Sequence, residues 1–128
     1  LKLLIRLLDQ LVGLYHEVAE LNPFDAEDYN QEVELDYNHV RSMVTGKYSD
    51  IGYYDVALDV LTVGGSDVGI GDAVDDLADI YMNVKESSIR VEQNSRADGL
   101  WHYRQMFDSH WGGHLRDVQR YLHAVVNA

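Results

Sequence analysis

The residues best suited to chemistry lie on one face of the last apolar segment, residues 95–128. We read this segment as a helix, and a turn of 100° per residue centres its core-facing stripe on Phe107. The apolar members of the stripe are Leu100, Trp111, Val118, Leu122 and Val125. The same arc carries four polar side chains: Tyr103, Arg104, His110 and His114. Such groups leave water only where they meet partners. The cluster is therefore either a buried group of hydrogen-bonded side chains that fixes the packing of the helices or a functional site.

His110 and His114 are the candidate metal ligands, because an i, i+4 pair places two imidazoles on one helix face. The zinc-peptidase pattern needs a Glu after the first His, where this chain has Trp111. Ferritin-like sites need two Glu-x-x-His motifs, and the chain offers only Asp36-x-x-His39. A three-histidine site would need His39, whose helical phase lies about 100° from its helix's buried centre. The alternative to a divalent-metal site is a chance pair among six histidines.

Arg104 needs a counter-charge if its face of the helix is buried. We predict Asp76 as its first partner and Asp79 as its second, since both lie on the preceding helix and Asp76 is at the edge of that helix's buried arc. The alternative reading is an ion pair that only sets the register of two helices. The sequence shows no hydrolase triad and no cofactor motif, so we assign no catalytic and no cofactor-binding residue.

The composition predicts one soluble domain. A chain of 128 residues can bury a sufficient core without a disulfide or a structural metal. The absence of cysteine also excludes disulfides and thiol catalysis. The net charge of −12 repels phosphate backbones and anionic lipids, so we expect neither nucleic-acid binding nor a membrane role. We expect a cytoplasmic protein. The first residue is Leu1, so we also expect the numbering to begin inside a longer natural chain.

The charge is uneven along the chain. Residues 1–84 contain 17 acids and four bases, whereas residues 85–128 contain five acids and six bases. An acidic half can bind a basic partner protein, although a solvated acidic surface explains the same pattern. The first apolar segment is interrupted by five charges and is therefore neither a signal peptide nor a membrane span: Lys2, Arg6, Asp9, Glu17 and Glu20.

Helical periodicity and capping residues divide most of the chain into helices. A first helix covers residues 1–21 and ends before Pro23. Asp25 caps a second helix that breaks near Leu35, and Asp36 caps a third over residues 37–45. Asp72 caps a helix over residues 73–93. The last helix opens on a capping-box pattern at residues 95–98.

Residues 47–72 have the least regular pattern. Residues 53–61 fit either a short helix or a strand, and we favour the helix because a lone strand would have no partner. Residues 62–72 read as a flexible loop. Their four glycines lack the Gly-Lys-Ser/Thr of a phosphate loop, and Asp67 and Asp72 would repel phosphate.

Two motifs resemble a known family. They are Asp-Leu-Ala-Asp-Ile-Tyr at residues 76–81 and Trp-x-x-Arg-x-x-Phe-x-x-His-Trp-Gly-x-His at residues 101–114. Together with a looser earlier segment, they make residues 37–122 resemble a family of small bacterial helical proteins classified as a domain of unknown function. The resemblance implies an all-helical fold and assigns no catalytic residue.

The sequence therefore predicts an all-α domain over residues 1–128, an irregular bundle of four long helices plus a short one. The last two long helices should pack antiparallel. The leading functional hypothesis is a non-enzymatic module that binds another protein or itself, with Trp101 as a candidate exposed anchor. The alternative is a bundle that binds a metal or small ligand at a His/Arg/Asp cluster, and an enzyme built on that cluster is a third reading.

Overall fold

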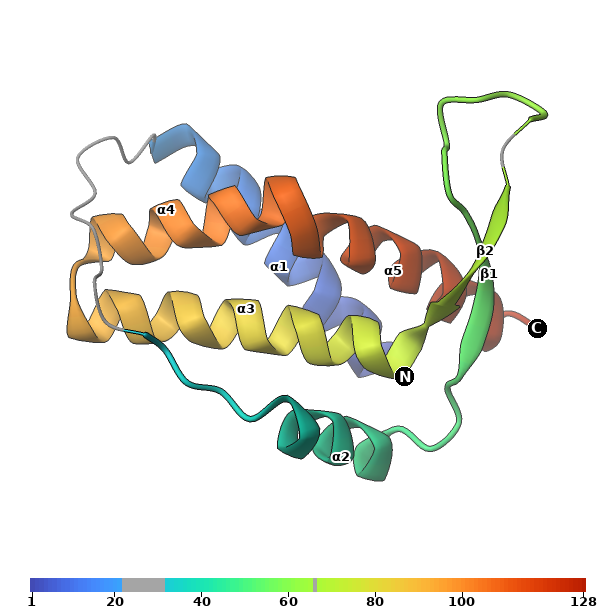
Figure 1. Cartoon of the computed structure of the whole chain (residues 1–128), viewed down its shortest axis with the longest axis horizontal. Coiled ribbons are helices and arrows are strands. Elements are labelled where there is room, and N and C mark those ends of the chain that lie inside the picture. The colour runs from blue at the N-terminus through green and yellow to red at the C-terminus, as the bar shows by residue number, and fades with distance from the viewer. Residues whose placement is uncertain (22–31, 66) are drawn as a thin grey trace.

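Two antiparallel helical rods form the centre of the molecule. The computed structural model describes residues 1–21, 32–65 and 67–128. One rod is α3 (Ala73–Gln93). After a tight turn, the second rod runs as α4 (Arg96–Met106), a π-helical turn η1 (Phe107–Trp111) and α5 (Gly112–Val126). Figure 1 shows the two rods side by side, which confirms the predicted antiparallel pair.

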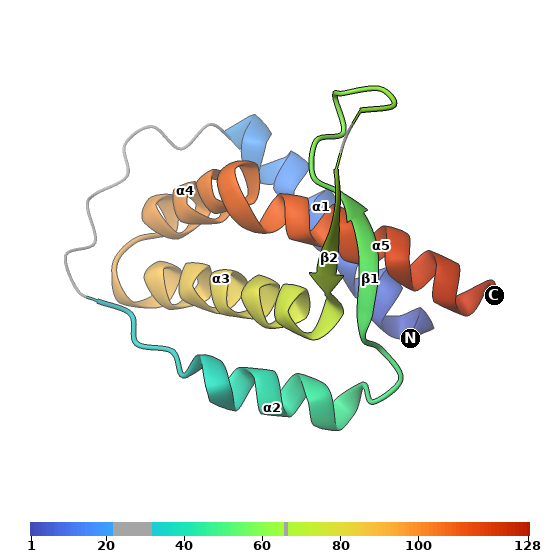
Figure 2. The same ribbon diagram turned by 45° about the vertical axis from the view of Figure 1, so that its right-hand side comes forward.

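Two further helices flank this pair. Helix α1 (Lys2–Leu21) packs across α4 and α5, and α2 (Tyr37–Lys47) lies along α3 (Figure 2). The core forms where α1, α3 and the second rod meet. Its largest fully buried apolar residues are Trp111, Leu115, Leu122, Val18 and Val118. The chain is mostly helical, so the predicted all-α class is confirmed.

Side-chain caps begin three of the helices where the sequence predicted them. Asp36 accepts a hydrogen bond from the backbone N–H of His39 at 3.2 Å, and Asp72 accepts one from Val74 at 3.0 Å. Ser95 accepts one from the N–H of Asp98 at 3.0 Å. These bonds satisfy N–H groups that have no partner within the helix, so each helix start is fixed by local sequence.

Residues 53–72 correct two predictions, because they form a hairpin and not a short helix and a loop. Strand β1 (Tyr53–Ala57) pairs antiparallel with β2 (Val68–Asp72), so the first strand does have a partner. Glycines in β2 leave room for large side chains of the neighbouring segment. A Cβ at Gly71 would lie 2.4 Å from the ring of Tyr54, and one at Gly69 would lie 2.5 Å from Leu58.

The second predicted helix lies largely outside the described residues. Its start at Asp25 falls there, and residues 32–36 are not helical. The break that we placed near Leu35 thus falls in a non-helical segment that leads to the Asp36 cap.

The sequence analysis predicted that the chain has no membrane-spanning helix. Among the described residues, no helix is both long and apolar enough to cross a bilayer.

Candidate metal centre

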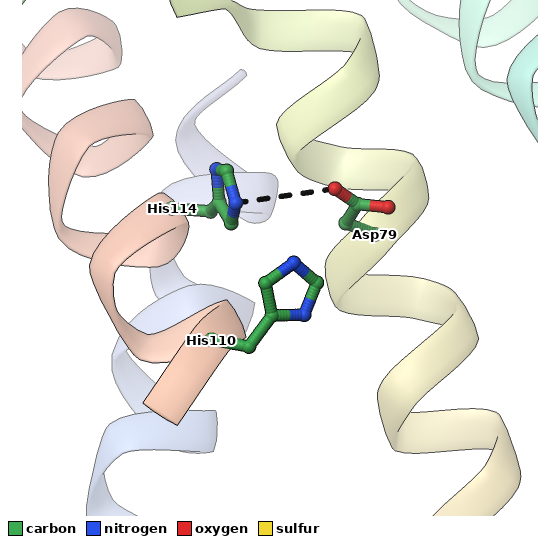
Figure 3. Close-up of side chains that lie close together, drawn as sticks. All are labelled: Asp79, His110 and His114. Atoms are coloured by element: carbon green, nitrogen blue, oxygen red, sulfur yellow. Dashed lines mark ion pairs between the residues drawn. The ribbon is translucent and has the colours of Figure 1, made fainter. Parts of the chain in front are cut away.

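Asp79, His110 and His114 lie together between the two rods. Asp79 comes from α3, His110 from the π-helical turn and His114 from the first turn of α5 (Figure 3). One ligand atom from each of the three residues lies within 4.8 Å of the other two. The Nε2 atom of His114 is 4.0 Å from the Oδ2 atom of Asp79. The imidazole ring centres of His110 and His114 are 5.0 Å apart.

The π-helical turn helps to present the two histidines. It inserts one extra residue into the helical ladder, and such insertions are frequent at functional sites. The backbone N–H of Gly112 bonds to the carbonyl of Phe107 five residues earlier. A Cβ on Gly112 would lie 2.3 Å from that carbonyl oxygen, so only glycine fits there. Aromatic packing holds the turn, with the ring of Trp111 centred 4.8 Å from Phe107.

Asp76 orients the His114 ring. Its Oδ1 atom is 2.8 Å from Nδ1 of His114, and its Oδ2 atom accepts a hydrogen bond from the hydroxyl of Tyr54. Asp76 is only 4% exposed, so both carboxylate oxygens find their partners within the protein. A carboxylate on Nδ1 favours the tautomer with its proton there and leaves Nε2 free to bind a metal. Nε2 is the atom that faces Asp79.

The hairpin contributes Tyr54, the last residue in the series of contacts that runs from His114 through Asp76. The ring of Tyr54 stacks on Tyr121 of α5 with centroids 4.8 Å apart. The Tyr121 hydroxyl accepts a hydrogen bond from the N–H of Gly52 at 3.0 Å. Burial and the bond to Asp76 raise the pKa of Tyr54, so its hydroxyl stays protonated as a donor.

The electrostatics of the site favour a cation. The hydrogen bond to Asp76 raises the pKa of His114, and Asp75 and Asp79 add to the effect. Burial raises the pKa of Asp79, and the charge of Asp75 raises it further. Burial and the charge of Asp76 likewise raise the pKa of Asp117. Several carboxylates thus share a partly buried space, and a bound cation would stabilise their ionised forms.

The residues fit a divalent transition metal. Two imidazoles and one carboxylate form a mixed N/O ligand set of the kind used by zinc, manganese, iron and nickel. Tetrahedral ligands with bonds of ~2.1 Å lie ~3.4 Å apart, so the three side chains need to close by only ~1 Å. Asp76 and Tyr54 provide the outer hydrogen bonds that metal-binding histidines usually have.

The structure brings together part of the predicted cluster. Asp79, His110 and His114 meet, whereas Asp76 contacts His114 and Tyr54 in place of Arg104. The tight turn between α3 and α4 explains the difference. It pairs residues at equal distances from the turn, and Arg104 is about ten residues, or ~15 Å of helix, closer to the turn than His114.

A buried ion pair does join α3 and α4, but it lies close to the turn between them and not at the level of His114. Arg90 of α3 lies 3.2 Å from Asp98 of α4, whose side chain is 3% exposed. Next to it, Nε2 of the buried His102 lies 2.6 Å from Glu86. Burial lowers the pKa of His102. The helical phase placed His102 opposite the core stripe, so sequence reasoning missed this group.

The other predicted residues have separate positions. Tyr103 is buried and its hydroxyl donates to the carbonyl of Leu11 at 2.6 Å. Arg104 is half-buried and His110 is exposed, although the stripe placed both on its buried arc. His39 is exposed on α2 and is not part of the cluster, and Trp101 is 44% exposed, as its phase suggested. Tyr54 was missed because its segment was taken for a helix.

The fold and this cluster define a helical-bundle domain with a candidate site of two histidines and one carboxylate. The chain belongs to the family described as "Domain of unknown function (DUF5063)", whose model matches residues 1–128. This confirms the family resemblance and extends it beyond residues 37–122. Comparison with curated proteins and with solved structures gave no match.

Proposed function

We propose that this protein is a metal-binding domain that holds one divalent transition-metal ion at Asp79, His110 and His114. The observation that carries the proposal is the hydrogen bond between Asp76 and Nδ1 of His114, at 2.8 Å. It directs the other ring nitrogen towards Asp79 and towards the His110 side of the cluster. Nδ1 is thus occupied by Asp76, and Nε2 is left 4.0 Å from the Asp79 carboxylate, where both atoms can serve as ligands of one ion.

Three protein ligands leave room for at least one further ligand. Structural zinc sites are closed by four protein ligands, whereas catalytic sites keep a position for water or substrate. His110 is exposed, so solvent reaches the open side of the cluster. The site is therefore suited to a metal that remains accessible to a small ligand.

Metal titration of the purified chain tests this proposal. After treatment with a chelator, the protein should bind one equivalent of Zn²⁺, Mn²⁺ or Ni²⁺ by calorimetry, and its melting temperature should rise. Binding at 100 times the dissociation constant adds about 2.7 kcal/mol to the free energy of unfolding. Replacing His114 by Ala should abolish both effects.

His123→Ala is the matched control, because His123 is exposed on the same helix and lies outside the cluster. It should bind metal like the parent chain. Equal binding by His114→Ala and the parent would place the metal elsewhere, and the absence of binding in all three proteins would refute the proposal.

A second candidate function is self-association. It is supported by four leucines of α1 that remain exposed although apolar: Leu3, Leu7, Leu14 and Leu21. Light scattering of the protein during size-exclusion chromatography tests this function, because a dimer has twice the 14.6 kDa mass of the chain.

A further inference from the structure

Helix α1 presents an apolar stripe to solvent as well as one to the core. Leu3, Leu7, Leu14 and Leu21 are 67%, 45%, 42% and 59% exposed. With Gln10 and Glu17 they follow an alternating spacing of four and three residues, which is the repeat of a coiled-coil contact. We call these six residues the outward seam. The core contacts of α1 lie on a neighbouring face, centred about 100° round the helix from the seam, through Leu4, Leu8 and Val18.

The outward seam continues into an apolar groove. The groove has a volume of about 320 Å³ and lies between α1, α2 and α3. Leu7 belongs to both the seam and the groove wall, and two groove residues, Met43 and Tyr81, are 42% and 44% exposed. Leu7 thus joins the outward seam to an exposed apolar groove, and exposed apolar surface of this kind marks interaction sites.

Gly13 lies in the middle of α1 and beside the outward seam. Glycine is among the least favourable residues within a helix. A Cβ at Gly13 would meet no atom of the described residues within 4 Å, so packing inside the chain does not require glycine here. A residue without a side chain at the middle of a helix allows a second helix to approach closely.

The charges of α1 favour an antiparallel second copy. The chain as a whole carries −12, yet α1 has two bases and three acids. Its bases, Lys2 and Arg6, lie in the first half, and Glu17 and Glu20 lie near the end. Glu17 lies at one edge of the outward seam, and Arg6 is exposed beside the same edge. In an antiparallel pair equal flanks meet, so Arg6 of each copy would face Glu17 of the other.

We infer that two copies of this chain associate through the outward seams of α1, antiparallel about a two-fold axis near the middle of the helix. The inference specifies the second candidate function and does not depend on the metal site. Each contact then occurs twice, with Leu3 of one copy beside Leu21 of the other. A 20-residue helix is only ~30 Å long, so the interface is small. We expect a dissociation constant on the order of micromolar.

Sedimentation of the 128-residue chain over a range of concentrations tests the interface. The parent chain should shift from monomer to dimer, and Leu7→Glu with Leu14→Glu should weaken the dimer at least tenfold. Both leucines are exposed in one copy, so the helical circular dichroism should stay unchanged. Val60→Glu with Leu61→Glu is the matched control, because these hairpin residues are even more exposed and lie far from α1 in the chain. It should dimerise like the parent.

Cross-linking tests the orientation, since the chain has no cysteine of its own. With a short bismaleimide, Gln10→Cys should link to itself near the two-fold axis. Leu3→Cys should not, because its two copies lie about 27 Å apart along the helices. A mixture of Leu3→Cys and Leu21→Cys should link.

Three results would overturn the inference. A monomer at every concentration refutes self-association altogether. A dimer that persists after the two glutamate substitutions in α1 refutes this interface while leaving self-association standing. Self-linking of Leu3→Cys refutes the antiparallel orientation.

Discussion

At the scale of single residues, the two nitrogens of His114 have different environments. Nδ1 is bound to a buried carboxylate and Nε2 faces a second, partly exposed one. The first contact sets the tautomer and the ring orientation, and the second creates the ligand set. Asp76 therefore acts on the site through His114, and Tyr54 acts through Asp76.

Asp76→Asn tests this positioning role. The amide keeps the size and one acceptor oxygen but loses the charge that polarises the imidazole. We expect metal affinity to fall about 10- to 100-fold, measured by competition with a chromophoric chelator. Glu92→Gln removes an exposed carboxylate further along the same helix and should leave the affinity unchanged. An unaltered affinity in Asp76→Asn would mean that Asp76 serves packing alone.

The raised pKa of His114 predicts a pH dependence for the metal-free chain. The folded state holds this proton more tightly than the unfolded state, so its contribution is complete below pH ~6.5 and disappears as pH rises through the folded pKa. The unfolding free energy of the parent, relative to His114→Gln, should fall as the pH rises above about 6.5. We expect a change below about 1 kcal/mol, because the ring is 35% exposed and screened by solvent.

Urea unfolding of both proteins in the presence of a chelator measures this difference. The comparison also removes the opposite contribution of His102, whose lowered pKa makes the fold lose stability as pH falls. A difference that is constant or grows with pH would contradict the assignment.

At the scale of elements, the π-helical turn determines how the second rod presents its histidines. The turn depends on a close approach of the backbone that only Gly112 permits. Its neighbour Gly113 has open space where a Cβ would stand. Of these two adjacent glycines, only Gly112 is therefore required by close packing.

Gly112→Ala and Gly113→Ala form a matched pair of variants. The first places a methyl group 2.3 Å from the carbonyl oxygen of Phe107 and should destabilise the chain by about 1–3 kcal/mol. The second should be neutral or stabilise by up to about 1 kcal/mol, because alanine is the better helix former. Urea denaturation measures both. Equal stabilities of the two variants would show that the turn tolerates a side chain.

At the scale of the whole molecule, the dominant feature is an excess of negative charge. Ten bases oppose 22 acids, and the described ion pairs neutralise only a few of these acids. Self-repulsion of this kind opposes the compact state and is screened by salt.

Added potassium chloride should therefore stabilise the dilute, metal-free chain. A change from about 0.01 M to about 0.1 M shortens the screening length from ~30 to ~10 Å. We expect a gain of about 1 kcal/mol, or a rise in melting temperature of about 3–6 °C. A variant that replaces exposed Asp50, Asp55 and Glu92 by their amides should respond less. A melting temperature that falls with salt would show that attractive pairs outweigh the repulsion.

Local signals made several elements predictable. The caps Asp36, Asp72 and Ser95 act through residues within three positions of themselves, so their sequence context is sufficient to place the helix starts. The pair His110 and His114 is likewise local, because four residues return to the same helix face. Nothing local distinguishes β1 from a short helix, since its identity depends on pairing with β2 eleven or more residues later.

The sequence alone determined the helical class, the helix starts and the two histidines, because periodicity and capping act over a few residues. Only the tertiary structure decided which aspartate meets which partner. That choice depends on the register set by the turn between α3 and α4, on the extra residue in the π-helical turn and on a hairpin that brings Tyr54 to Asp76. These are relations between distant segments, and packing fixes them only when the whole chain has folded.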